Sequence, residues 1–204
     1  MDDVTIRSAF IDDSGPVAAV VAAALAGYPH WVYAEPDPAA RARAVSTYYR
    51  ADMVDLIGHG ATEVAEAAGR IVAAAVWVPW EALPDAWDGG AVELLDPPVA
   101  ARLGRALEAM AAAVPEEPHS YLDVLAVHPD WQGQGLGTLA AGPGIRRTVA
   151  AGRGCYLDTA HAENLAFYRR LGFEVVSEVS VDGLVPWGRW RSPRPFVSPG
   201  TSNV

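Results

Sequence analysis

The sequence predicts an α/β domain with a mixed central β-sheet flanked by helices, and three observations support this prediction. Segments that favour strands and segments that favour helices are interleaved in the order β-α-α-β-β-α-β-α-β-α-β-β. Hydrophobic residues make up 51% of the 204 residues, so the chain can bury a full core. A glycine-rich stretch, residues 133–137, joins an apolar strand to a helix.

The chain before residue 80 is expected to form one strand, two helices and a two-stranded hairpin. The strands cover residues 4–10, 61–68 and 70–79, and the helices cover about 14–26 and 37–59. The first strand alternates apolar and polar residues, whereas the second helix carries apolar residues at helical spacing. Asp13-Ser14 is a candidate N-cap for the first helix, and Gly69 marks the hairpin turn.

Residues 80–116 are expected to be an insertion between strands rather than a domain. Residues 79–98 are rich in Pro, Gly and Trp and are predicted to be a loop, and residues 99–114 are predicted to be a helix. The remaining strands are expected at residues 121–127, 155–159, 173–181 and 184–190, and the helices at 135–151 and 163–171. Residues 1–191 are therefore expected to form a single domain, followed by a flexible tail at 192–204.

The chain is acidic, with a formal net charge of −10 and a sequence pI of about 4.8. This charge argues against nonspecific binding to nucleic acid, which needs a basic surface. An acidic surface favours a cationic substrate such as an amine, although a solvated acidic face would explain the charge without any ligand.

Neither secretion nor membrane insertion is expected. The N-terminus, Met1-Asp2-Asp3, lacks the basic region of a signal peptide, and the apolar run at 17–27 is shorter than the roughly 20 residues of a membrane span. A single cysteine, Cys155, excludes an internal disulfide, fits a reducing cytosol and is expected to pack in the core. The five histidines show no ligand spacing, so no metal is expected. We expect a cytoplasmic protein that is a monomer or a homodimer.

The densest signal is the stretch Leu125-Ala-Val-His-Pro-Asp-Trp-Gln-Gly-Gln-Gly-Leu-Gly-Thr138. Its glycines lie where a strand gives way to a helix, so the backbone can approach a ligand closely. The helix N-terminus adds about half a positive charge. Together these features predict a pyrophosphate site that needs no lysine, although an ordinary glycine-rich turn would use the same residues.

Three phosphate-binding motifs compete for this stretch. A P-loop requires a lysine, and the chain has none. The Rossmann fingerprint has a formal match in residues 135–140, but it should follow its strand immediately, whereas residues 128–134 intervene here. The third motif is an acyl-CoA site.

The acyl-CoA interpretation rests on a resemblance to two motifs of the GNAT superfamily of N-acetyltransferases. Gln132-Gly-Gln-Gly-Leu-Gly137 resembles motif A, Gln/Arg-x-x-Gly-x-Gly/Ala. Downstream, Asn164-Leu-Ala-Phe-Tyr-Arg-Arg-Leu-Gly-Phe173 is similar to the family's Asn-x-x-Phe/Tyr-Tyr-x-x-x-Gly-Phe. The core resemblance covers about residues 119–191. It implies the GNAT fold, with strands splayed at the cofactor site, and acetyl-CoA (coenzyme A) as the cofactor.

Within the superfamily, several features resemble puromycin N-acetyltransferases and their relatives. These are Gly27-Tyr-Pro29, Val76-Trp77, the 80–116 insertion, Gly142-Pro-Gly144 and Leu157-Asp-Thr159. That group carries Glu where this chain has Asp158, which leaves the substrate open. The resemblance implies acetyl transfer to a small-molecule amine, with antibiotics and aminonucleosides as candidates.

The resemblance also implies a set of cofactor-binding residues. The main chain of Leu125, Ala126 and Val127 is expected to bind the pantetheine arm. The pyrophosphate is expected to lie on the N–H groups of the next loop and helix, at Gln132, Gly133, Gln134, Gly135, Leu136, Gly137 and Thr138. Phe167 and Asn164 are expected to contribute from the following helix, where Asn164 binds the cofactor, caps the helix, or both.

Tyr168 is the candidate general acid, because a phenol can protonate a departing thiolate with little energetic mismatch. Asp123 and Asp158 are the candidate bases or amine anchors, and His161 is a weaker alternative. Asp123 is expected mid-strand, on the same side of the sheet as Tyr121, Leu125 and Val127. A buried carboxylate there needs a partner or a purpose.

Tyr28, Trp77 and Trp80 are expected to line an aromatic acceptor pocket, although core packing explains such residues equally well. The implied reaction is direct transfer within a ternary complex. Two alternatives remain open: a non-catalytic acyl-CoA sensor with the GNAT fold, and a dinucleotide-binding oxidoreductase. The presence of both Tyr168 and Asn164 counts against the sensor, and a comparison of NAD with CoA binding would test the oxidoreductase.

Overall fold

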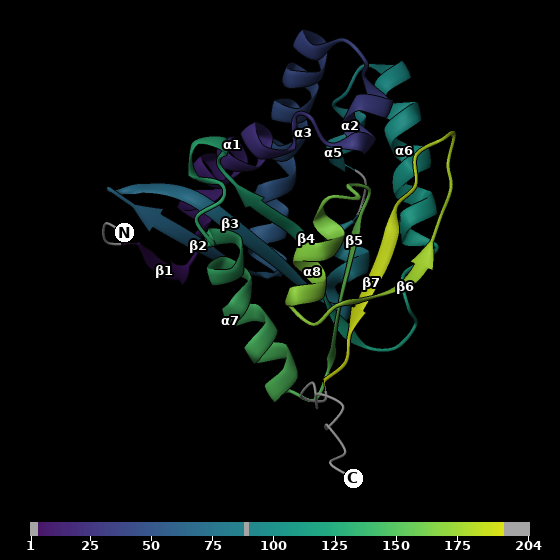
Figure 1. Cartoon of the computed structure of the whole chain (residues 1–204). Helices are drawn as coiled ribbons and strands as arrows, with labels where there is room; N and C mark the ends of the chain where they lie inside the picture. Colours follow the sequence, from purple (N-terminus) through teal and green to yellow (C-terminus); the bar gives the residue numbers. More distant parts are fainter. Residues whose placement is uncertain (1–3, 88–89, 194–204) are drawn as a thin grey trace.

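A seven-stranded sheet, in the order β1-β2-β3-β4-β5-β7-β6, forms the centre of the molecule (Figure 1). The computed structural model describes residues 4–87 and 90–193. The strands are β1 (Thr5–Ser8), β2 (Ala61–Ala67), β3 (Arg70–Pro79), β4 (His119–Val127), β5 (Gly154–Thr159), β6 (Glu174–Glu178) and β7 (Trp187–Arg191). Neighbouring strands are antiparallel except β4 and β5, which are parallel, so the predicted mixed sheet is confirmed.

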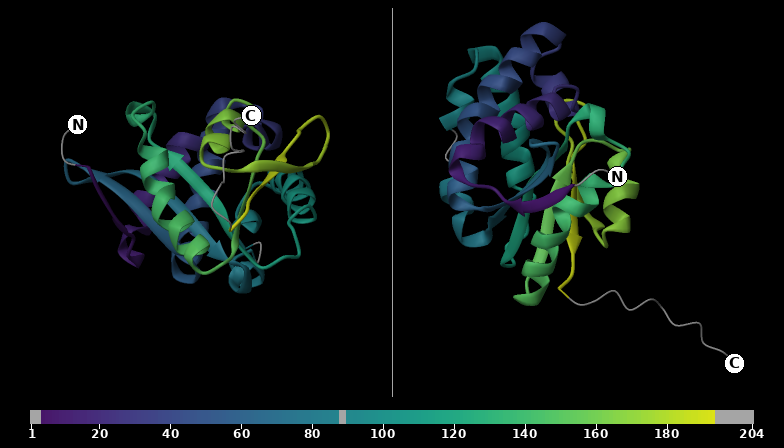
Figure 2. Two further views of the ribbon diagram at one scale, coloured as in Figure 1. Left: turned by 60° about the horizontal axis from the view of Figure 1, so that its bottom comes forward. Right: turned by 90° about the vertical axis from the view of Figure 1, so that its left-hand side faces the viewer.

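Helices cover both faces of this sheet. They are α1 (Ser14–Leu25), α2 (Pro29–Ala34), α3 (Pro38–His59), α4 (Leu83–Ala86), α5 (Gly90–Glu93), α6 (Pro97–Ala111), α7 (Leu136–Ala150) and α8 (Asn164–Arg170). In the right-hand view of Figure 2, α1 and α3 lie on one side of the strands, and α7 and α8 lie on the other. No helix in the described parts of the chain is both long and apolar enough to cross a membrane.

The core has two main layers, one on each face of the sheet. Val76 points into the layer under α1 and α3, whereas its neighbour Trp77 points into the layer under α7 and α8. This alternation follows from the two-residue period of a strand. Cys155 is fully buried in the α7 layer, as expected, and burial raises the pKa of its thiol to about 11.

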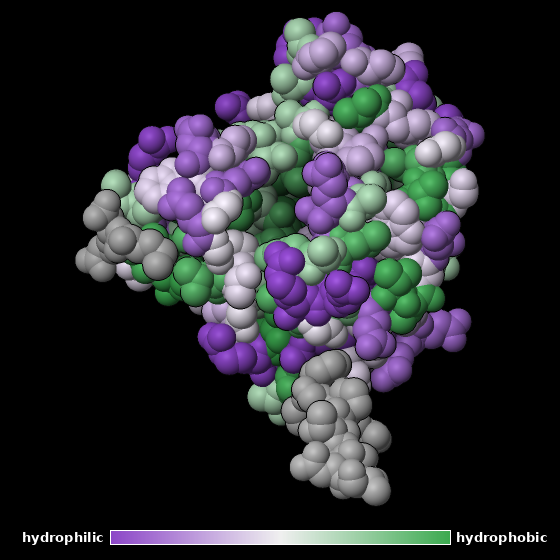
Figure 3. Space-filling view, viewed as in Figure 1, coloured by the Kyte–Doolittle hydropathy of each residue, from purple (hydrophilic) through white to green (hydrophobic). Residues whose placement is uncertain are grey.

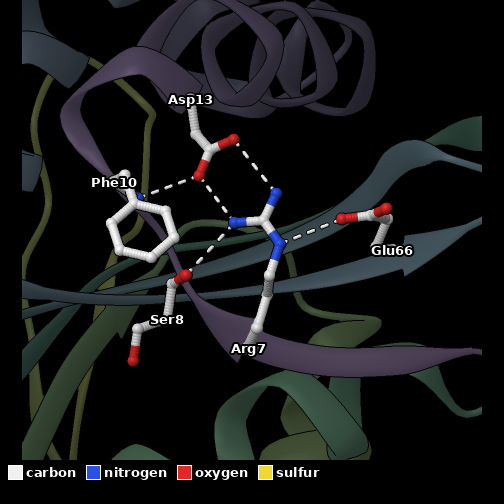
Figure 4. A network of polar contacts seen from close by, with 5 residues as sticks. All are labelled: Arg7, Ser8, Phe10, Asp13 and Glu66. Atoms are coloured by element: carbon white, nitrogen blue, oxygen red, sulfur yellow. Dashed lines mark hydrogen bonds and ion pairs between the residues drawn. The ribbon is translucent and has the colours of Figure 1, made fainter.

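Asp13 does not cap α1 with its side chain, contrary to the expectation from the sequence. Its carboxylate instead accepts hydrogen bonds from the Arg7 guanidinium at 2.6 and 3.1 Å and from the Phe10 N–H at 2.8 Å (Figure 4). Arg7 also donates to Glu66 on β2 at 2.9 Å. A charged guanidinium is a stronger hydrogen-bond partner than a backbone N–H. The Asp13 carboxylate therefore binds Arg7 instead of capping the helix, and it links β1 to the start of α1.

The structure differs from the expected elements mainly where helices are short. The predicted loop at 79–98 contains a 3₁₀ turn at Trp80–Ala82 and the one-turn helices α4 and α5, and α2 was not predicted. One turn of helix is too short to produce a recognisable apolar period. Of the tail expected at 192–204, residues 194–204 lie outside the described residues.

Both predicted hairpin turns are confirmed at the level of backbone geometry. Ala68 and Gly69 have φ of 50° and 71°, and Asp182 and Gly183 have φ of 49° and 87°. Two consecutive left-handed residues are the arrangement that joins antiparallel strands with a two-residue turn. The strand before Asp182 ends earlier than expected, at Glu178. Beyond it, the Val179 N–H donates to the Pro186 carbonyl at 3.0 Å, and an isolated Val181–Leu184 bridge continues the pairing.

Candidate active site

Strands β4 and β5 separate after a short stretch of pairing. Only His119, Ser120 and Tyr121 of β4 pair with β5, although β4 continues to Val127. Beyond Tyr121, the edge of β4 that faces β5 is therefore not covered by that strand. Backbone N–H and C=O groups need partners, so this edge suits a ligand that forms main-chain hydrogen bonds. Figure 3 shows a hollow near the centre of this face of the molecule.

A β-bulge at Asp123 changes which side chains share a face of β4. Val76 of β3 pairs with Val124, but the next residue, Trp77, pairs with Leu122, so Asp123 is the extra residue. Tyr121 and Asp123 consequently face the same cavity. Leu125 and Val127 pack on the opposite face, against the α7 layer. The expectation that they share a side with Asp123 was wrong, because it assumed an unbroken alternation.

The glycine-rich loop forms an open cradle in front of α7. Gly133 and Gly135 have φ of 75° and 81°, and Gly135 occupies the N-cap position of α7. A Cβ atom added to either glycine would meet no atom within 4 Å, so glycine is required here for backbone conformation and not to relieve crowding. The space over these glycines and the positive end of α7 fit a pyrophosphate.

Two side chains connect this cradle to the rest of the site. The Gln132 side chain donates a hydrogen bond to the carbonyl oxygen of Val127 at 3.0 Å, which ties the loop to the end of β4. Phe167 of α8 lies over Gly137, where an added Cβ would come 3.4 Å from the ring. The two motifs identified in the sequence therefore meet in space at the start of α7.

Tyr168, the expected general acid, is buried beside the aromatic rings of Phe167 and Phe173. Burial raises the pKa of its hydroxyl well above the ordinary value, and Tyr28 and Asp158 raise the pKa further. Arg189 acts on the same pKa in the opposite direction. The hydroxyl therefore holds its proton at neutral pH.

Tyr28 lies at the carboxyl end of β5 rather than in the cavity described below. Its hydroxyl forms hydrogen bonds with Thr159 and Asn164. The sequence left open whether Asn164 caps α8. Asn164 is the first residue of α8 and follows the N-cap residue Glu163, so it does not occupy the capping position. His161, the weaker base candidate, stacks at a tilt on Tyr28, with ring centroids 5.6 Å apart.

A cavity of about 560 Å³ lies between α3, α5 and α6, with β4 and β5 at its floor. Among the described residues, six carboxylates line it: Asp52, Asp55, Glu93, Glu108, Asp123 and Asp158. Four aromatic residues of this described set line it as well: Tyr48, Tyr49, Trp87 and Tyr121. Within the described parts of the chain no arginine lines this cavity, and burial lowers the pKa of its one histidine, His30, to about 4. The lining is therefore anionic at neutral pH.

Asp123 and Asp158, the two expected base candidates, both face this cavity from its floor. Asp123 accepts a hydrogen bond from the Trp87 indole N–H at 2.9 Å, and Asp158 accepts one from the Tyr121 hydroxyl. Burial raises the pKa of Asp123 to about 6, against the lowering effect of Trp87 and with a further rise from the charge of Asp158. Burial also raises the pKa of Asp158.

Trp77 and Trp80, expected to line an acceptor pocket, do not line this cavity. Trp77 is 1% exposed and packs on Gly144 of α7, where any Cβ would overlap its indole. This close contact explains why α7 contains a glycine after Pro143. Trp80 stacks on His119 at the other end of β4.

None of the aromatic residues that line the cavity was predicted to do so, and Trp87 is the one that contacts the floor most directly. It contacts both floor residues of β4, through the hydrogen bond to Asp123 and through edge-on packing against Tyr121 at 4.8 Å between ring centroids. It lies in the segment predicted to be a loop, and its only sequence signal was the tryptophan content of that segment.

Known proteins are similar to this chain in sequence and in fold. The sequence profile of the Acetyltransferase (GNAT) family matches residues 29–173. A structure from Corynebacterium glutamicum, described as histone acetyltransferase HPA2 and related acetyltransferase, is 25% identical with a TM-score of 0.71, over 97% of this chain and 100% of the other.

Two further structures share the fold. One is an agmatine N-acetyltransferase in its apo form, at 19% identity and a TM-score of 0.65, over 94% of this chain and 100% of the other. The other is the PaiA N-acetyltransferase of Thermoplasma acidophilum in complex with coenzyme A, at 12% identity and a TM-score of 0.60, over 93% and 99%. This chain therefore belongs to the GNAT family and is an acetyltransferase that uses acetyl-CoA.

Proposed function

We propose that this enzyme acetylates a small cationic amine by direct transfer, and that the amine binds in the carboxylate-lined cavity. One observation carries the proposal: Asp123 and Asp158 form the floor of a cavity that no arginine of the described residues lines. A buried cluster of carboxylates is costly unless cations offset it. A protonated amine supplies such a cation and also contains the nitrogen that must react.

The residues around the cradle fit the cofactor. Acetyl-CoA, when bound, supplies the acetyl group as a thioester whose sulfur departs as a thiolate. The exposed edge of β4 at Leu125, Ala126 and Val127 offers main-chain groups to the pantetheine arm. Residues Gln132 through Thr138 offer N–H groups at the positive end of α7 to the pyrophosphate. Phe167 supports this loop through its contact with Gly137.

Proton transfers are assigned to groups whose pKa values suit them. Asp123 or Asp158 takes a proton from the incoming ammonium, and the pKa of about 6 for Asp123 is close to what a base needs at neutral pH. Tyr168 then gives its hydroxyl proton to the departing sulfur. Cys155 is fully buried with a raised pKa, which supports direct transfer rather than an acyl-cysteine.

Two sets of acceptors are worth testing first. Agmatine is a cationic amine by its chemistry, and the protein named for acetylating it has the same fold. Antibiotics and aminonucleosides form the second set, because of the features that resemble puromycin N-acetyltransferases; acetylation of an antibiotic would make this a resistance enzyme. The proposal includes a cytoplasmic monomer or homodimer.

The test is release of free thiol from acetyl-CoA with a panel of amines: agmatine, spermidine, puromycin and an aminoglycoside. We expect turnover with at least one cationic amine and none once all of the amino groups of that compound are acetylated. Binding of acetyl-CoA without turnover of any amine would instead support the non-catalytic sensor.

Tyr168→Phe serves as the internal control for the chemistry. Loss of the hydroxyl should lower kcat by roughly 10²–10⁴-fold, the usual contribution of a general acid, and leave acetyl-CoA affinity unchanged. A loss confined to KM would indicate a binding role for Tyr168.

A further inference from the structure

Arg189 of β7 is a buried cation without a counterion. It is 2% exposed, and no carboxylate of the described residues lies within salt-bridge distance of it. One nitrogen donates to the carbonyl oxygen of Phe173 at 2.8 Å, whereas the buried Nε has no hydrogen-bond partner among the described residues. Such a charge destabilises a fold, so its presence calls for a reason other than packing.

Arg189 lies next to the candidate general acid. It pairs in register with Leu157 of β5, and Leu157, Phe173 and Tyr168 belong to the same hydrophobic cluster. Phe173 connects the two residues: its carbonyl accepts from Arg189, its N–H donates to the Tyr168 carbonyl at 3.0 Å, and its ring lies 6.1 Å from the Tyr168 ring.

The other charges near this pair do not neutralise Arg189. Asp158 and Tyr28 raise the pKa of the Tyr168 phenol, whereas Arg189 lowers it. Arg169 and the exposed Glu174 share a surface groove with Arg189, and Arg169 adds a like charge. Arg189 is thus the cation that favours a negative charge on the Tyr168 oxygen.

We propose that Arg189 is a positioning residue whose charge stabilises the phenolate that Tyr168 becomes after it gives up its proton. The inference rests on the proposed role of Tyr168. In that step the phenol O–H bond breaks, its electron pair stays on the oxygen, and the proton forms the S–H bond of coenzyme A. The phenolate then regains, through water, the proton that the newly acylated nitrogen loses, so no charge remains on the protein.

This role predicts opposite effects on activity and stability. Arg189→Met removes a buried unpaired charge and keeps an unbranched side chain, so the melting temperature should stay level or rise. The phenolate loses its nearby cation, so kcat should fall about tenfold, equivalent to one pKa unit of the phenol. Acetyl-CoA affinity should not change, because among the described residues the Arg189 side chain hydrogen-bonds to the Phe173 carbonyl and to none of the expected cofactor-binding residues.

The experiment is a double-mutant cycle measured by kcat, acetyl-CoA affinity and melting temperature. Arg189→Met is measured in the natural protein and in Tyr168→Phe, and Arg189→Lys, which keeps the charge, should recover most of the rate. In the Tyr168→Phe background, Arg189→Met should cause no further loss, because there is no phenolate to stabilise. Arg191→Met is the matched control: Arg191 also donates to a backbone carbonyl, that of Leu171 at 3.0 Å, but does not act on Tyr168.

The outcomes separate the two hypotheses. An equal loss of kcat from Arg189→Met in both backgrounds would overturn the inference, as would a loss of kcat in Arg189→Met that merely follows a lower melting temperature of that variant. A Tyr168→Phe enzyme with natural kcat would instead refute the proton-donor role itself.

Discussion

At the scale of single residues, the two carboxyl groups on the cavity floor control the expected pH dependence. A base must be unprotonated, and the pKa of Asp123 is about 6. If Asp123 is the base, kcat/KM should therefore fall as the pH drops through about 6, and Asp123→Asn should remove this acidic limb along with most of the rate. Asp158→Asn would then mainly raise the KM of the acceptor.

If Asp158 is the base instead, Asp158→Asn should remove the acidic limb, and Asp123→Asn should mainly raise the KM of the acceptor. A pH–rate profile that neither substitution alters would mean that the proton leaves through water, and both assignments would be withdrawn.

The pH dependence of stability gives an independent control for the pKa of Asp123. The pKa of Asp123 is about 6 in the folded protein and 3.8 for an ordinary aspartate. The contribution of this difference to the stability of the fold is fully present below pH 3.8, and it is lost as the pH rises through about 6. Asp123→Asn should lack this loss.

At the scale of elements, we expect the start of α7 to determine cofactor affinity. Gly135→Asp would place a negative charge at the expected pyrophosphate site and strain a residue at φ 81°. A like charge a few ångströms away costs on the order of 1–4 kcal/mol, so acetyl-CoA affinity should fall about tenfold or more. Acetyl-CoA should then raise the melting temperature of the natural protein but not that of the variant.

Gly152→Asp is the matched control for this substitution. Gly152 follows α7 at its other end, with φ of 71° and similarly open space around its Cα. Both variants should lose similar stability from backbone strain, roughly 1–2 kcal/mol. Only Gly135→Asp should lose acetyl-CoA binding, and equal affinity in the two variants would remove Gly135 from the site.

The elements that the sequence predicted well are those with local causes. The Ala68-Gly69 and Asp182-Gly183 turns require left-handed backbone, and the long helix α3 carries buried apolar residues at helical spacing over several turns. The bulge at Asp123 has no such local signal. It becomes visible only when β4 is paired with β3, and one extra residue is enough to move Leu125 and Val127 to the other face.

At the scale of the whole molecule, the residues expected at the cofactor leave a clearer sequence signal than the residues of the cavity proposed for the acceptor. The cradle is contiguous in sequence, from Gln132 to Thr138, and its chemistry is carried by glycines and a helix terminus. The acceptor cavity is assembled from α3, α5, α6 and two strands. Its wall residue Trp87 directly follows the one-turn helix α4, which is too short to show an apolar period, and its carboxylates extend over the sequence from Asp52 to Asp158.

The charge of this cavity leads to a prediction about acceptor selectivity. Asp55, Glu93 and Glu108 are exposed residues of the lining, whereas Asp123 and Asp158 lie at the floor. An acceptor whose reacting amine reaches the floor would bring a second, distal cation close to the exposed carboxylates. Glu108→Gln should therefore raise the KM of a dication such as agmatine. The expected factor is up to about five, which corresponds to the interaction free energy of an exposed ion pair.

The comparison that isolates this effect uses a monoamine of the same length and a second variant. Glu108→Gln should leave the KM of the monoamine unchanged, because that acceptor has no distal cation, and should leave kcat unchanged for both. Glu116→Gln makes the same charge change at an exposed position outside the cavity lining and should alter neither KM. Because salt screens exposed charges over about 8–10 Å, the selectivity should shrink at high ionic strength. An equal rise in KM for monoamine and dication would show that Glu108 acts on the reacting amine or on the fold, and not on a second cation.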